Sequence, residues 1–153
     1  SKSFNVTGAR ISFLVGRPDV IAACKKLRSQ IDFGMFLPVQ KAAIAALTGP
    51  LDSVKRQCGE YQARRDALCG GLRSIGWDVP NSHGSMFVWA PLPTGYTDSM
   101  AFCLELIEKA GVICTPGFSF GPSGEGYVRF ALTLPVDRIE EAVKAIADSG
   151  MIH

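Results

Sequence analysis

The run V-I-C-T-P-G-F-S-F-G-P-S-G-E-G-Y-V-R-F-A-L at residues 112–132 decides the fold. It predicts a strand over Val112–Thr115, a glycine-rich loop over Pro116–Gly126 and a second strand over Tyr127–Leu132. Successive side chains of a strand point to opposite faces of a sheet, so Arg129 lies on the face opposite its two apolar neighbours. The run therefore indicates two strands of a small sheet with one charged side chain away from the apolar face.

The residues around this run complete an α+β pattern over 76–153. Short apolar runs predict two further strands, at Trp77–Val79 and Ser85–Ala90. Apolar residues at helical spacing predict a helix from about Met100 to Gly111 and a last helix over Val136–Ala147. The expected architecture is a small mixed or antiparallel sheet covered by helices.

The first half of the chain follows a different pattern. An apolar stripe at spacings of three and four predicts one long helix over 51–75, which we expect to connect two lobes and to be capped by Gly76. Before it, residues 1–50 contain a predicted buried strand, Arg10–Val15, and two apolar helices. One strand has no sheet partner there, so we expect 1–50 to be part of a larger domain and 76–153 to be a separate small domain.

Composition excludes several classes of protein. An apolar fraction of 47% is ordinary for a globular protein and excludes intrinsic disorder. A formal charge of +2 gives no argument for nucleic acid or a membrane surface as partner. The five cysteines include no Cys-x-x-Cys pair, and with only two histidines they do not indicate a metal site. The simplest interpretation is five reduced, mostly buried thiols in a cytoplasmic protein.

Lys2 and Arg10 are the first residues that could carry chemistry. A lysine amine can bind an aldehyde cofactor covalently if it is held and deprotonated. An arginine eight positions later, beyond Gly8, could return to the same end of a strand and bind a phosphate with two hydrogen bonds. Spacing alone leaves the simpler interpretation open, in which both are surface side chains.

The run S-K-S-F-N-V-T-G-A-R-I-S-F-L-V-G at residues 1–16 resembles the cofactor-attachment motif of class I/II, fold-type-I aminotransferases. These enzymes use pyridoxal 5′-phosphate. The resemblance implies that Lys2 carries the cofactor and that Arg10 binds its phosphate. Ser1 matches a small polar position beside the lysine, and the resemblance makes it a cofactor-binding residue as well.

A second run, from Ala110 to Leu132, resembles the small-domain segment of the same family. The resemblance implies that Arg129 binds the α-carboxylate of the substrate, and a planar guanidinium can grip a planar carboxylate with two parallel hydrogen bonds. The alternative is a structural arginine paired with Glu125 or Asp137. The amino-acid sequence of this segment is most similar to that of aminotransferases of the diaminopimelate subgroup.

The resemblance covers essentially the whole chain and carries further implications. It implies amino acid and 2-oxo acid substrates and a homodimeric enzyme, with no nucleic-acid or membrane partner. It also implies that 1–50 is the end of a large cofactor-binding domain and that the chain is the C-terminal part of such an enzyme. We expect these 153 residues alone to be inactive.

Two other functions stay open at this point. A pyridoxal-phosphate-dependent C–S lyase would share the lysine and both arginines. A stand-alone small domain would act as a binding or regulatory module without chemistry. Substrate profiling separates the first from an aminotransferase, and protease protection of residues 1–50 separates the second.

Overall fold

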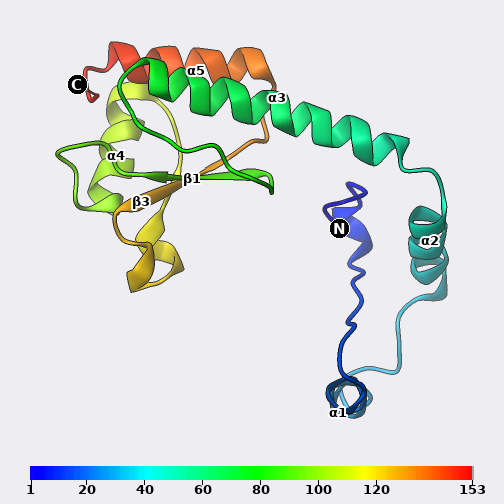
Figure 1. Ribbon diagram of the computed structural model, residues 1–153. Helices are drawn as coiled ribbons and strands as arrows, with labels where there is room; N and C mark the ends of the chain where they lie inside the picture. The colour runs from blue at the N-terminus through cyan, green and yellow to red at the C-terminus, as the bar shows by residue number, and fades with distance from the viewer. Residues whose placement is uncertain (153) are drawn as a thin grey trace. The chain divides into compact units, whose positions relative to one another are not determined.

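The computed structural model describes residues 1–152, which form two compact units. Unit 1 is Ser1–Gln57, and unit 2 begins at Cys58. Figure 1 shows the chain from its blue N-terminus to its red C-terminus. The division into 1–50, 51–75 and 76–153 expected from the sequence remains a prediction. None of the helices within residues 1–152 combines the length and apolar character needed to cross a membrane.

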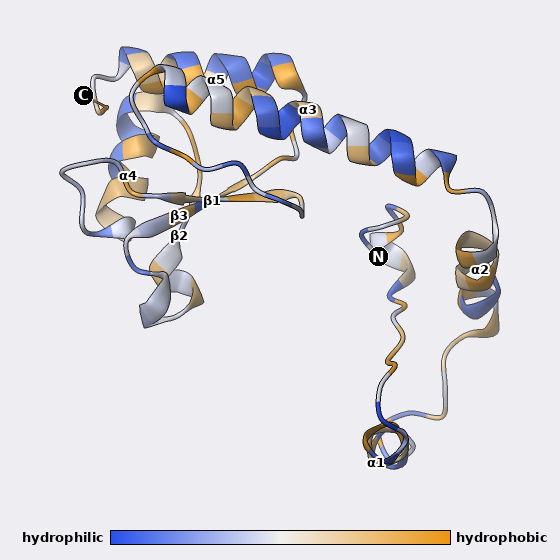
Figure 2. Cartoon of the chain, in the orientation of Figure 1, coloured by the Kyte–Doolittle hydropathy of each residue, from blue (hydrophilic) through white to orange (hydrophobic). Residues whose placement is uncertain are grey.

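Unit 1 contains two helices without a core. Helix α1 is Pro18–Arg28 and helix α2 is Leu37–Thr48, and each has a proline in its first turn, where the missing N–H costs no hydrogen bond. A short 3₁₀ turn, η1, covers Thr7–Ala9. No residue of these three elements is buried, and Figure 2 shows hydrophobic residues along both α-helices. The helices therefore follow local sequence preferences rather than burial within the unit.

The strand expected at Arg10–Val15 is absent from the structure, so that prediction is wrong. Residues 10–15 have no regular secondary structure, and the side chains of Phe13 and Val15 are 73% and 79% exposed. A strand needs a neighbour that satisfies its backbone N–H and C=O groups. Within unit 1, as far as the structure describes it, no second strand supplies one.

The long helix expected at 51–75 is confirmed as α3, Asp52–Ser74. Its last third carries the buried residues Leu68, Cys69 and Leu72. Gly76 follows with φ = 96°, a conformation that a glycine reaches without steric cost and that lets the chain turn after the helix. Whether α3 connects two lobes remains a prediction.

Unit 2 contains an antiparallel sheet of three strands in the order β1-β3-β2. Two helices accompany the sheet, and both were expected from the sequence. Helix α4 begins after Asp98, whose carboxylate accepts hydrogen bonds from Met100 and Ala101, and it ends at Gly111 with φ = 66°. The elements are β1 (Phe87–Pro91), α4 (Ser99–Ala110), β2 (Thr115–Pro116), β3 (Tyr127–Ala131) and α5 (Val136–Asp148).

Two strand predictions in unit 2 need correction. Trp77–Val79 is not a strand, because its backbone bonds to α3: the Trp77 N–H donates to Leu72 O, and Val79 O accepts from the Arg73 side chain. The strand expected at Val112–Thr115 is reduced to β2, Thr115–Pro116. At the beginning of the expected strand, the Val112 N–H donates to Leu106 O at the end of α4 instead of joining the sheet.

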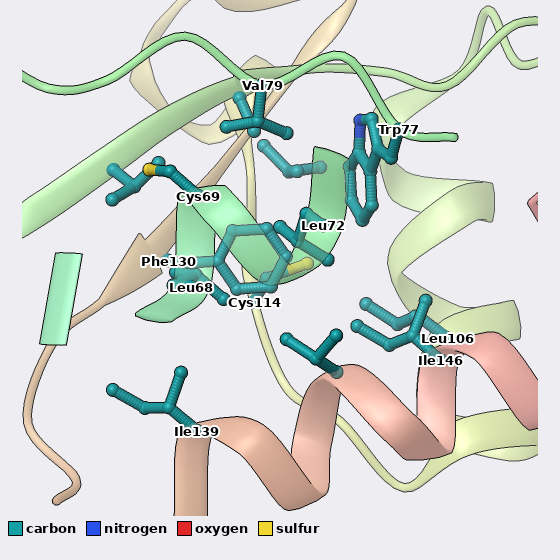
Figure 3. Packing of buried hydrophobic residues seen from close by; sticks show 14 of the residues in the cluster. Leu68, Cys69, Leu72, Trp77, Val79, Leu106, Cys114, Phe130, Ile139 and Ile146 are labelled. Atoms are coloured by element: carbon teal, nitrogen blue, oxygen red, sulfur yellow. The ribbon is translucent and has the colours of Figure 1, made fainter. Parts of the chain in front are cut away.

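Unit 2 holds the hydrophobic core. Figure 3 shows α3, α5 and strand β3 contributing side chains to one cluster around Phe130 and Leu72. Trp77 lies in the same cluster, with ring centroids 5.3 Å from Phe102 and 5.7 Å from Phe130, and its indole N–H donates to Pro91 O at 2.7 Å. This core covers one face of the sheet, so the other face is left for a site.

Candidate functional site

Arg129 lies at the centre of the sheet. It is the middle residue of β3, opposite Trp89 of β1 and Thr115 of β2. Its neighbours Val128 and Phe130 are buried in the core, so strand alternation directs Arg129 to the opposite face, as the sequence indicates. The outer face of the sheet therefore presents one cation from its central strand.

The guanidinium of Arg129 has no acidic partner among residues 1–152. Its Nε is buried and donates to nothing in the described chain. The central guanidinium carbon lies over two phenyl rings, 4.2 Å from the centroid of Phe87 and 4.5 Å from that of Phe120. A buried donor without a protein acceptor is rare and costly, so this atom is placed to meet an acceptor that the chain does not supply.

The structure does not support the alternative in which Arg129 pairs with Glu125. The Glu125 carboxylate accepts hydrogen bonds from the backbone N–H of Ser99 at 2.7 Å and of Gly126 at 3.0 Å. These two bonds, that of Gly126 first, hold the pKa of Glu125 below its usual value. Asp137, the other candidate partner, forms no ion pair with Arg129 within the described residues.

Aromatic side chains surround this arginine, and sequence reasoning did not single them out. Besides the two phenyl rings, Trp89 stacks on Tyr127 with centroids 5.6 Å apart and meets Phe120 edge-on at 5.5 Å. A signal for Phe87 was present, because it lies two residues before Trp89 and shares its face of β1. No comparable pattern in the sequence points to Phe120, which lies in a loop.

Lys2 and Arg10 lie in unit 1, whereas Arg129 lies in unit 2. Ser1 and Lys2 open a tight turn, in which Ser1 O accepts from the Val6 N–H at 3.0 Å and Lys2 O accepts from the Asn5 N–H at 3.2 Å. The side chains of Lys2 and Arg10 are exposed. Arg10 has φ = 50° and makes one long hydrogen bond, 3.4 Å to Thr7 O. No hydrogen bond or ion pair within residues 1–152 joins the side chains of Lys2 and Arg10, so their shared site remains a prediction.

A cavity of about 330 Å³ lies in unit 1 between the N-terminal segment and α2. Ser1 and Ser3 contribute to its lining, and most of the other lining side chains are apolar, among them Val39 and Leu47. Lys2 and Arg10 are not among the lining residues. Of the three residues expected to hold a cofactor, the cavity therefore includes Ser1 but neither Lys2 nor Arg10.

A family model described as "Aminotransferase class I and II" matches residues 1–146. The chain belongs to the class I and II aminotransferase family. The α+β architecture expected from the resemblance is also that of the solved aminotransferase structures to which the chain is similar. These structures include a probable N-succinyldiaminopimelate aminotransferase from Thermus thermophilus, with a TM-score of 0.85 and 32% identity over 96% of this chain and 39% of that one. An aromatic aminotransferase from Pyrococcus horikoshii gives a TM-score of 0.89 and 28% identity over 97% and 40%.

Curated relatives in the family carry the name LL-diaminopimelate aminotransferase. That of Halothermothrix orenii is 44% identical over 99% of this chain, and that of Moorella thermoacetica is 46% identical over 95%. The matched chain spans 39% and 37% of the length of these two relatives. Family membership is thus shown, while the roles of Ser1, Lys2, Arg10 and Arg129 remain predictions.

Proposed function

We propose that this chain supplies the cofactor lysine and the substrate-carboxylate arginine of a pyridoxal-phosphate-dependent aminotransferase. Such an enzyme transfers an amino group between an amino acid and a 2-oxo acid. Membership of the class I and II family supports the reaction. The observation that carries the site is the Arg129 guanidinium, which has a buried Nε without an acceptor and no carboxylate partner within residues 1–152.

The donor set of unit 1 fits pyridoxal phosphate. The cofactor presents an aldehyde, for which the amine of Lys2 is the matching nucleophile, and a phosphate, for which the guanidinium of Arg10 is the matching cation. Neither side chain forms an ion pair within the described residues, so both remain free for these partners. Ser1, the residue before Lys2, adds a hydroxyl that can donate to the phosphate.

The chain's own residues then divide the work of the reaction. When bound, the cofactor supplies an electron sink for the carbanion that forms at the substrate Cα. The amine of Lys2 would hold the cofactor aldehyde until the substrate amine replaces it there, and it would then take up the proton that leaves the substrate Cα, which is general acid–base chemistry by an amine. Arg10 fixes the phosphate end, and Arg129 binds the α-carboxylate and so orients the Cα–H bond.

We infer a diamino acid of the diaminopimelate class as amino donor, because relatives 44% and 46% identical carry that name. We further propose that residues 1–50 belong to a larger cofactor-binding domain. The exposed apolar side chains of unit 1, such as Phe33 and Phe36, support this, because a folded domain would cover them. A homodimer and a cytoplasmic location are part of the same proposal.

Turnover by the pyridoxal-phosphate-loaded enzyme that contains this chain tests the function. With LL-diaminopimelate and a panel of 2-oxo acids, we expect amino-group transfer that depends on the acceptor. Lys2→Ala abolishes this turnover, and Lys25→Ala, which removes an exposed lysine of α1, leaves it unchanged. Substantial transfer in Lys2→Ala would exclude Lys2 as the proton carrier. Release of a 2-oxo acid and ammonia without an acceptor would identify a lyase instead.

The carboxylate role of Arg129 is tested in the same assay. Arg129→Ala removes a charge-assisted hydrogen-bonded pair, so KM for the amino acid should rise on the order of tenfold to a hundredfold. Arg138→Ala is the matched control, because the exposed side chain of that arginine pairs with Glu141 on α5. An unchanged KM in Arg129→Ala would remove Arg129 from the carboxylate site.

A further inference from the structure

Two phenylalanines reach Arg129 from the two sides of its strand. Phe87 belongs to β1, and Phe120 ends the 3₁₀ turn η2, Gly117–Phe120, which follows β2. Since β3 lies between β1 and β2, one ring comes from a neighbouring strand, β1, and the other from the turn that follows the second neighbour, β2. Their centroids lie 4.2 Å and 4.5 Å from the guanidinium carbon of Arg129.

Such contacts hold a guanidinium without using its donors. The attraction acts between the cation and the face of each ring, whereas the five N–H groups of arginine lie in the guanidinium plane. An acidic partner would occupy those N–H groups and compete with a ligand. At Arg129 the aromatic contacts take the place of an acidic partner, and the buried Nε stays free within the described chain.

We propose that Phe87 and Phe120 are positioning residues that fix the Arg129 guanidinium for two-point binding of the substrate carboxylate. The inference rests on the proposed function, since it concerns the same carboxylate. In this proposal the two rings limit the side-chain rotamers of Arg129 before the substrate binds. Less side-chain entropy is then lost when each substrate molecule binds.

The loop that carries Phe120 is built to hold the ring in place. The backbones of Gly117 and Gly124 touch: a Cβ on Gly117 would lie 2.0 Å from Gly124 O, and one on Gly124 would lie 2.1 Å from Gly117 O. Only glycine permits this approach. The loop is tied to the first residue of α4, because Glu125 accepts from the Ser99 N–H and the Ser99 hydroxyl accepts from the Phe118 N–H at 3.3 Å.

Phe120 is the residue to change, because its side chain is 52% exposed and contributes little to the core. Phe120→Leu keeps an apolar side chain and removes the ring face, and Phe120→Tyr keeps the ring. Phe118→Leu is a matched control, since Phe118 lies in the same turn, is 55% exposed and makes no ring contact with Arg129 in the described chain.

In the loaded enzyme we expect Phe120→Leu to raise KM for the amino acid about threefold to tenfold, with kcat changed less than about twofold. Phe120→Tyr should restore the KM, and Phe118→Leu should leave it unchanged. A fall in kcat without a change in KM would contradict positioning of the carboxylate. Equal effects of Phe120→Leu and Phe118→Leu would assign the change to the loop rather than to the ring.

A magnetic-resonance measurement on the chain itself gives a readout independent of turnover. Protons above an aromatic ring face resonate upfield, so the Hε signal of Arg129 should lie upfield of the other arginine Hε signals and should move downfield in Phe120→Leu. An Arg129 Hε at an ordinary position in the unsubstituted chain would overturn the inference. This measurement decides the matter even if the Phe120→Leu enzyme does not fold.

The two proposals fail in different ways. A raised KM in Arg129→Ala with an unchanged KM in Phe120→Leu overturns the positioning role and leaves the carboxylate site standing. An unchanged KM in both variants overturns the carboxylate site and the positioning role together. Absence of acceptor-dependent turnover in the unsubstituted enzyme overturns the proposed function.

Discussion

Unit 1 and unit 2 come from one chain but are stabilised differently. In unit 2 eighteen hydrophobic residues from Leu68 to Met151 are buried in one cluster, whereas no side chain of unit 1 is buried. Helices α1 and α2 nevertheless form in unit 1, with proline in the first turn and apolar faces that remain exposed. The comparison shows that local signals suffice to define a helix, while a fixed tertiary arrangement needs buried area.

The same difference governs the site residues. Arg129 is positioned by a strand pair, two aromatic rings and a braced loop, all within unit 2. Lys2 and Arg10 lie on exposed segments with few bonds. The substrate side of the proposed site is therefore preorganised within this chain, and the cofactor side is not.

The largest expected effect comes from deleting the same leucine atoms in each unit. Leu72 of α3 is fully buried, and Leu27 of α1 is 66% exposed. Leu72→Ala should lower the free energy of unfolding of unit 2 by about 2–5 kcal/mol. Leu27→Ala should change it by less than about 0.5 kcal/mol. Urea denaturation followed by near-ultraviolet circular dichroism measures both, and equal losses would contradict the contrast between the units.

A smaller effect is expected from adding one methyl group to a 3₁₀ turn in each unit. In Gly117→Ala the new Cβ meets Gly124 O and Tyr127 O, so the loop must shift, at a cost of about 1–3 kcal/mol in unfolding free energy. In Gly8→Ala of η1 no atom lies within 4 Å of the new Cβ. That variant should be neutral, and thermal unfolding of the two variants compares them directly. A neutral Gly117→Ala would contradict the close backbone contact.

Thiol reactivity separates the core of unit 2 from the exposed parts of the chain, which include Cys58 at the beginning of that unit. Cys24 and Cys58 are exposed, whereas Cys69, Cys103 and Cys114 are buried. Burial raises the pKa of these three thiols, so they have less reactive thiolate and are reached only through opening of the core. With a chromogenic disulfide reagent at pH 8, we expect two fast thiols and three that react on the order of 100-fold slower. Five equal rates would mean that unit 2 has no stable core.

The smallest effect is a pH dependence. The lowered pKa of Glu125 means that its ionised form stabilises the folded state above the unfolded value of 4.5, and that this stabilisation is lost as the pH falls through the lower folded pKa. Glu125→Gln should therefore make the free energy of unfolding of unit 2 fall less steeply as the pH decreases at the acid end of its pH profile, called here the acid limb. Asp19→Asn is the control from unit 1, where Arg17 lowers the pKa of the Asp19 carboxyl. It should leave that limb unchanged, as acid titrations of unfolding would show.

Much of the fold could be predicted because its signals are local. Helices α3, α4 and α5 begin and end within a few residues of their predicted bounds, since apolar spacing, proline and glycine act over one or two turns. The strands at Arg10–Val15 and Trp77–Val79 could not be decided in this way. Each is an apolar run, but whether it becomes a strand depends on a neighbouring strand far along the chain. The second run instead bonds to the end of α3, because the Trp77 N–H donates to Leu72 O.

The candidate site was predictable to a different extent. Alternation along Tyr127–Leu132 correctly directed Arg129 away from the core. Periodicity could not show that its guanidinium meets Phe120, because that contact depends on how the loop folds back through Gly117 and Gly124. The positions of Lys2 and Arg10 relative to Arg129 depend on how the units are arranged, which no local pattern encodes.

The tryptophans of the chain, Trp77 and Trp89, report on opposite faces of the same sheet. Trp77 is buried beside Phe130 and bonded to Pro91 O, so its fluorescence emission should be blue-shifted and shielded from aqueous quenchers. Trp89 is 38% exposed and touches Phe120. Its emission should be red-shifted, accessible to a quencher and altered when an anion settles on Arg129. The sheet thus carries two optical probes, one for the integrity of the core and one for occupancy of the arginine.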